Sequence, residues 1–147
     1  MKTGTLNKLL SAKLNPERFQ VRGTAIYWLA TPTAEETALA ADVIANYDTL
    51  AVAHQAQKME QQAIDGIDAI LDAQAKAYGF DSVHTAAVWT ISKNEARKAR
   101  ADALVAWADS MWDYAEAEWE KQGKGESTFT TVAEFLAAGP KFPGVTG

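Results

Sequence analysis

Two long stretches of helical periodicity constrain this chain most. In residues 49–78 the apolar side chains recur every three or four positions, and residues 93–122 have the same spacing. At 1.5 Å per residue, each stretch predicts a helix on the order of 45 Å long. Alanine, the residue that best favours a helix, is frequent in both. Joined by a short connection, the two helices predict an antiparallel helical hairpin.

Local signals indicate how the two helices are joined. Gly79 is expected to adopt the left-handed conformation that commonly ends a helix. Asp81 and Ser92 bound a short bridging helix over residues 82–91. Ser92 and Glu95 have the spacing of a capping box, in which a hydroxyl and a carboxylate satisfy free backbone N–H groups. The second long helix is therefore expected to begin at Lys93.

Shorter elements flank the hairpin. Thr33 with Glu36, and Thr131 with Glu134, repeat the capping-box spacing. They predict helices over residues 34–46 and from Thr131 through residue 138. Near the N-terminus, Phe19–Val21 and Ala25–Leu29 are rich in aromatic and β-branched residues and are split by Arg22-Gly23, which predicts a small β-hairpin.

The expected fold class is mainly α, with a long antiparallel helical hairpin, short flanking helices and a small N-terminal β-hairpin. The length of 147 residues suits a single domain. We expect an extended or β-hairpin arm over 1–30 and a helical body over 31–122. Residues 123–147 then form a loop, a short helix and an extended tail.

Composition excludes several classes of function. The net charge of −5 argues against a general binder of nucleic acids or anionic membranes, because phosphate groups would not be attracted overall. The sequence contains no run of eighteen apolar residues, so no membrane-spanning helix is predicted, and the first residues lack the apolar core of a secretory signal. The absence of cysteine excludes disulfides and thiolate metal sites.

No catalytic constellation stands out. The two histidines, His54 and His84, lie in different predicted helices and have no partner at metal-ligand spacing. The glycines form no phosphate-binding loop, and no nucleophile motif is present. Glu60 falls on the apolar side of its helix and is expected to be partly buried. We therefore predict no enzymatic activity, no catalytic residue, no cofactor and no metal site.

Aromatic residues are the best candidates for partner binding. Trp107 is expected in the core, and Trp112 points about 140° away from it on the helix. Trp112 and Trp119 share a side, and they are either further core residues or anchors for a partner, since tryptophan is enriched in binding hot spots. Tyr27 and Trp28 of the predicted β-hairpin are further contact candidates.

Charges on the second long helix oppose the helix dipole. Arg97 and Arg100 lie near its positive end, where we expect Asp68 and Asp72 of the first helix as partners. Acidic residues crowd the negative end. Two interpretations stay open for them, a solvated face or a contact with a basic partner; the residues are Asp109, Asp113, Glu116 and Glu120.

Three segments together resemble a group of small tailed-bacteriophage proteins. Ala75–Ser82 matches an A-x-x-x-G-[YF]-D-S turn, residues 104–112 match a V-A-W-x-D-x-[VM]-W segment, and residues 131–140 match a T-x-x-E-[FL]-[LI]-A-x-L-P segment. The resemblance covers most of the chain from about Ile26. It departs at Ala108, where an arginine is usual, and at Gly139, which replaces a leucine.

The resemblance implies a structural component of a phage tail, assembled in the host cytoplasm and located in the virion tail. Such a protein attaches or organises tail fibres or baseplate subunits, and it can also associate with copies of itself. One alternative is a tail-fibre assembly chaperone that is absent from the mature virion. Another is a small acidic regulator of a host protein, since an acidic surface can mimic nucleic acid.

Overall fold

The protein is mainly α-helical. The structure, a computed structural model, describes residues 1–145 and is 69% helical, with one small antiparallel β-hairpin near the N-terminus. The chain divides into two compact units, Met1–Lys58 and Met59–Gly147. The expected fold class is confirmed. The division at residue 58 falls inside a helix, whereas the sequence suggested an arm that ends at residue 30.

The first unit packs helices against the β-hairpin. Its elements are α1 (Thr3–Ser11), a 3-10 turn η1 (Pro16–Arg18), β1 (Phe19–Arg22), β2 (Ala25–Trp28), α2 (Ala34–Ala45) and the start of α3 (Tyr47–Ala77). The predicted hairpin is present, with Phe19 opposite Trp28.

Residues 1–30 are not an extended arm throughout, because α1 occupies residues 3–11. Leu6 and Leu10 are fully buried, and Leu14 joins the same cluster. The spacing of four residues places Leu6 and Leu10 on one helix face. Burial of that face against the rest of the unit stabilises a helix with no side-chain cap at its N-terminus.

The junction of α2 and α3 combines a predicted cap with a shifted boundary. Thr33 and Glu36 form both hydrogen bonds of the predicted capping box. The next helix begins at Tyr47, two residues before the expected start. Tyr47 is buried, and its hydroxyl accepts a hydrogen bond of 2.8 Å from the Lys2 backbone N–H.

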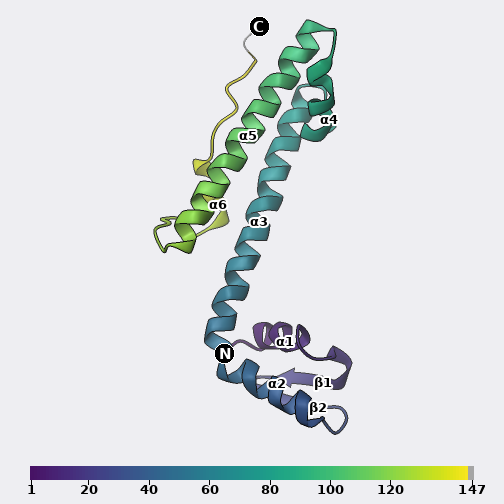
Figure 1. Ribbon diagram of the computed structural model, residues 1–147, viewed down its shortest axis with the longest axis vertical. Coiled ribbons are helices and arrows are strands. Elements are labelled where there is room, and N and C mark those ends of the chain that lie inside the picture. Colours follow the sequence, from purple (N-terminus) through teal and green to yellow (C-terminus); the bar gives the residue numbers. More distant parts are fainter. Residues whose placement is uncertain (146–147) are drawn as a thin grey trace. The chain divides into compact units, whose positions relative to one another are not determined.

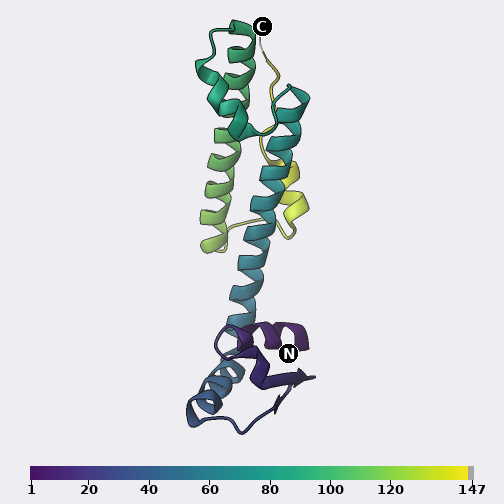
Figure 2. The same cartoon turned by 90° about the vertical axis from the view of Figure 1, so that its right-hand side faces the viewer.

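The second unit contains the long helical hairpin. It comprises the rest of α3, α4 (Val83–Val88), a 3-10 turn η2 (Trp89–Ile91), α5 (Glu95–Gly123) and α6 (Val132–Ala138). The α3 part and α5 lie side by side and antiparallel, with α4 at the end where α3 stops (Figure 1 and Figure 2). Side chains that face each other across the two helices form the core; the fully buried larger ones are Ile67, Leu71, Leu104 and Met111.

Gly79 ends α3 as predicted. Its φ of +86° lies in the left-handed region. The Phe80 N–H bonds the Ala75 carbonyl at 3.0 Å, and the Gly79 N–H bonds the Lys76 carbonyl at 3.0 Å, which is the Schellman arrangement. Phe80 is buried beyond the turn, so the chain reverses direction with its backbone groups paired.

The predicted capping box at Ser92 and Glu95 is wrong. The N-cap of α5 is Asn94, whose side chain accepts a hydrogen bond of 3.0 Å from the Arg97 N–H. Asparagine caps a helix as well as serine does, and here it moves the helix start from Lys93 to Glu95. Ser92 instead accepts a hydrogen bond from the Asn94 N–H.

The predicted pairing of Asp68 and Asp72 with arginines is also not formed. Within residues 1–145, Arg100 donates to the carbonyls of Tyr78 and Ala96, and Asp72 accepts from the Val83 N–H at 3.0 Å. Asp72 therefore binds the start of α4 rather than an arginine. Register between the helices comes from packing and from this backbone contact.

The C-terminal segment packs onto the hairpin. The predicted capping box at Thr131 and Glu134 is present, and α6 lies over Gly66 of α3, where a Cβ would come within 2.5 Å of Leu136 Cδ1. The extended segment that follows runs along α5 (Figure 1). Phe142 meets two rings in T-shaped arrangements, Tyr78 at 5.2 Å and Trp107 at 5.3 Å between centroids. The tail prediction for Thr146 and Gly147 falls outside the described residues.

Candidate protein-interaction surfaces

An elbow of residues 82–94 links the two long helices and is held firmly. Ser82 caps α4 by accepting from the Thr85 N–H at 3.1 Å, whereas the predicted boundary residue Asp81 is exposed. The Val83 N–H is bound by Asp72 of α3. Ala86, in the middle of α4, is completely buried. The elbow therefore presents its outer side chains from a fixed backbone.

Three large apolar side chains on this elbow face solvent. Val88 is 68% exposed, Ile91 is 85% exposed and Trp89 is 38% exposed. We call these three residues the elbow patch. The Arg97 guanidinium lies 4.6 Å from the centroid of the Trp89 ring, a cation–π distance. Exposed apolar residues clustered on a rigid turn are typical of a surface that another molecule covers.

The elbow patch lies in the basic part of the unit. Residues 82–100 contain four Lys or Arg residues and one Glu. Lys98 pairs with Asp102 at 2.6 Å, and Arg100 binds backbone carbonyls. Lys93 and Arg97 form no ion pair among residues 1–145, and both are exposed. The apolar side chains are thus bordered by cations that lack a carboxylate.

The opposite charge is gathered further along α5. Residues 101–120 contain six Asp or Glu residues and no Lys or Arg. Four of these, all exposed, form what we call the acidic stripe; they are Asp109, Asp113, Glu116 and Glu120. Glu120 pairs with Lys124, while the other three have no ion-pair partner within the described residues. Only Glu120 lies in the last turn of α5, where a negative charge opposes the helix dipole; the other three lie further inside the helix than the sequence suggested.

Trp112 and Trp119 lie beside this stripe, between core and surface. Both are half-buried and pack against the core, with ring centroids 6.5 Å apart. Trp107 is buried, as expected, and its Nε1 donates to the Pro140 carbonyl at 2.9 Å. The two outer tryptophans therefore contribute to the core and also leave ring surface open to a partner.

The hairpin aromatics differ from each other. Trp28 is half-buried and meets Phe19 edge to face at 6.2 Å. Tyr27 points outward, half-exposed, with the Arg22 guanidinium 5.5 Å from its ring centroid. Of this predicted pair, Tyr27 is the residue available to a partner within the first unit.

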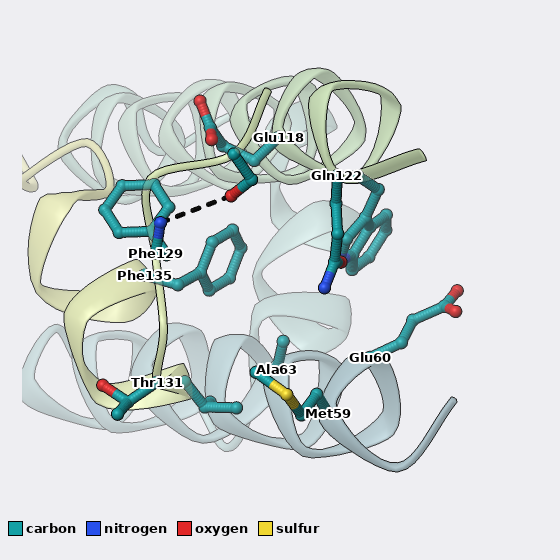
Figure 3. Close-up of a pocket in the computed structure, with 11 residues that line it drawn as sticks. Met59, Glu60, Ala63, Glu118, Gln122, Phe129, Thr131 and Phe135 are labelled. Carbon is teal, nitrogen blue, oxygen red and sulfur yellow. Dashed lines mark hydrogen bonds between the residues drawn. The ribbon is translucent and has the colours of Figure 1, made fainter. Parts of the chain in front are cut away.

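A small hollow opens at the other end of the second unit, between the start of its α3 part, the end of α5 and residues 127–135 (Figure 3). Its empty volume is about 370 Å³ including the mouth, and apolar side chains such as Met59, Ala63 and Phe135 line most of it. Glu118 is buried at its edge and pairs with Lys121. Glu60 is exposed, so the expectation that it is partly buried is wrong.

Tyr114 holds α6 in place beside this hollow. Tyr114 lies near it, donates to the Phe135 carbonyl at 2.9 Å and stacks on the Phe135 ring. Burial raises the pKa of the Tyr114 hydroxyl, and the charge of Glu118 adds to the effect. The hydrogen bond and the ring stacking between Tyr114 and Phe135 hold α6 against α5.

Within residues 1–145, no group of three or more His, Cys, Asp or Glu side chains is arranged to hold a metal ion. No helix in this part of the chain is long and apolar enough to span a membrane. Comparison with protein-family models, with curated proteins and with solved structures finds no match to this chain.

The elbow patch was missed by sequence reasoning. Val88 and Ile91 have the apolar character of core residues, and only the folded path of the elbow turns them outward. One signal could have indicated it. Lys93 and Arg97 follow an apolar run and lie near the N-terminal end of a helix, where the helix dipole disfavours positive charge. The helix therefore does not explain these cations, whereas an external partner would.

Proposed function

We propose that this protein is a non-enzymatic structural component of a bacteriophage tail, where it attaches or organises fibre or baseplate subunits. The observation that carries the proposal is the elbow patch, a rigidly held group of exposed apolar residues. Val88 and Ile91 together offer aliphatic surface that is costly to leave in water. Covering it with another subunit removes that cost.

The resemblance to small tail proteins supports the same conclusion. One of its motifs, Ala75–Ser82, is the turn that ends α3 and starts the elbow. Another, residues 104–112, supplies the core side chains Leu104, Trp107 and Met111. The resembling residues thus build the hairpin that carries the elbow patch. We place the protein in the virion tail, after assembly in the host cytoplasm.

The test is quantitative mass spectrometry of virions from the phage that encodes the chain, purified and washed in high salt. We expect the chain at a fixed ratio to the fibre or baseplate subunits. Its absence from washed particles, with its presence in assembly intermediates, would instead support the chaperone alternative. Recovery with a host protein and with no tail subunit would support the acidic regulator.

A matched pair of variants links the elbow patch to this function. Ile91→Asp places a charge in the elbow patch, and we expect it to prevent incorporation into tails. Val52→Asp makes the same change at a position that is 72% exposed in the first unit, outside the elbow patch. We expect this control to be incorporated normally. Equal incorporation of both variants would remove the elbow patch as the binding surface.

A further inference from the structure

We propose that the partner covering the elbow patch is a second copy of this chain, which places its acidic stripe against the elbow. The proposal rests on the proposed function and names the partner for the same surface. Each copy would then bind two neighbours, one through its elbow and one through its acidic stripe.

Charge complementarity selects this occupant. Lys93 and Arg97 border the elbow patch without a carboxylate partner in the described chain. Asp109, Asp113 and Glu116 lack a cationic partner in the same way. Within one chain these charges stay unpaired, and Arg97, in the first turn of α5, also opposes the helix dipole. A contact between copies pairs each set with the other.

The apolar parts of the two surfaces also match. Glu116 lies four residues after Trp112 and three before Trp119, so all three neighbour one another on α5. The half-buried tryptophan rings therefore form an apolar border beside the acidic stripe. Val88 and Ile91 can pack on these rings while Arg97 reaches the carboxylates. This gives an apolar centre with a charged rim, the usual anatomy of an interface.

The contact cannot form within one chain. Arg97 and Glu116 are separated along α5 by about 28 Å at 1.5 Å per residue. At 100° per residue they also point about 100° apart around the helix. The elbow of one copy must therefore meet the stripe of the next. Such a head-to-tail contact is heterologous and generates a ring or a filament.

The first measurement is sedimentation velocity of the isolated protein over a range of concentrations. We expect the average mass of the sedimenting species to rise with protein concentration at low ionic strength. We expect added salt to weaken the association, because salt screens exposed charges. A chain that stays monomeric up to millimolar concentration in low salt would overturn the proposal.

Two variants then separate the halves of the contact. Ile91→Asp removes the elbow half and keeps the acidic stripe, while Glu116→Lys removes the stripe half and keeps the elbow. Each change should weaken self-association by about thirtyfold or more, as expected for loss of a central contact. Val52→Asp, outside both surfaces, should associate like the unmodified chain.

Mixing the two defective variants gives the decisive result. The Glu116→Lys chain still has an intact elbow, and the Ile91→Asp chain still has an intact stripe. We expect the mixture to form a one-to-one dimer that grows no further, whereas each variant alone stays monomeric. Circular dichroism of each variant checks that both remain folded. A mixture that stays monomeric, or a variant that still assembles alone, contradicts the contact.

The outcome is independent of virion mass spectrometry. A monomeric chain found in washed virions would refute self-association and leave the proposed tail function standing. A chain that assembles by the elbow and stripe but is absent from virions would support self-association and refute the proposed tail function.

Discussion

Substitution of Gly79 measures the energy of the turn that starts the elbow. The residue has φ +86°, and a Cβ built on it meets no atom within 4 Å. The cost of a side chain there is therefore conformational and contains no steric clash. For a non-glycine residue this conformation costs roughly 1–2 kcal/mol. We expect Gly79→Ala to lose about that much, Gly79→Asn to lose less and Gly79→Val to lose more.

The assay is urea unfolding followed by tryptophan fluorescence, which reports mainly on the second unit because four of the five tryptophans lie there. In thermal unfolding, a loss of 1 kcal/mol corresponds to about 4–8 °C for a domain of 60 to 100 residues. Gly123→Ala is the matched control. Its Cβ also meets nothing within 4 Å, but Gly123 ends α5 without a positive φ. This control should be neutral or gain up to about 1 kcal/mol. If Gly79→Ala matches the control, the left-handed turn has no energetic role.

Three further predictions concern packing and pH. Gly66→Val should destabilise the second unit by about 1–3 kcal/mol in urea unfolding, because its side chain must displace Leu136; a gain in stability would contradict the docking of α6. Trp112→Ala combined with Trp119→Ala should lower the free energy of unfolding, by roughly half of the 3–5 kcal/mol per ring that full burial gives; an unchanged free energy would place both rings outside the core. Hydrogen bonds from the Thr130 backbone N–H and hydroxyl, and from the Thr131 N–H, hold the pKa of Glu134 below its usual range. The stability that Glu134 contributes is present above the pKa that it has in the unfolded chain, and it is lost as the pH falls through its lower pKa in the folded protein. Glu134→Gln should therefore flatten the acid dependence of the unfolding midpoint. An unaltered pH profile would argue against the hydrogen bonds to Glu134.

The parts of the fold that local chemistry determines could be predicted from the sequence. Gly79 and the Thr33 and Thr131 capping boxes act through neighbouring backbone atoms, and each is present. The Ser92 capping box was wrong because two caps compete within three residues. Asn94 is the cap in the structure, and it follows a 3-10 turn over Trp89–Ile91 that local spacing does not reveal.

The features set by distant contacts could not be predicted. α1 depends on burying Leu6 and Leu10 against elements beyond residue 18, and its own short sequence is only weakly patterned. Gly66 allows the close approach of Leu136, a residue far along the chain that no local pattern connects with it. Exposure of Val88 and Ile91 likewise follows from the path of the whole elbow. The sequence therefore showed the charges and the tryptophans of the candidate site but missed the elbow patch.

The position of Phe142 has a consequence for synthesis on the ribosome. Its ring packs against Tyr78 and Trp107, and the Pro140 carbonyl satisfies the Trp107 indole. Translation adds Pro140 and Phe142 only after all of α3 and α5 has been synthesised. Until then the nascent hairpin exposes an aromatic ring and an unsatisfied indole N–H, which favours chaperone binding or aggregation. The first unit has no such delay, because every residue of its core precedes residue 59. The two halves of the chain should thus mature at different times during translation, and a stalled ribosome would carry a finished first unit and an unfinished second one.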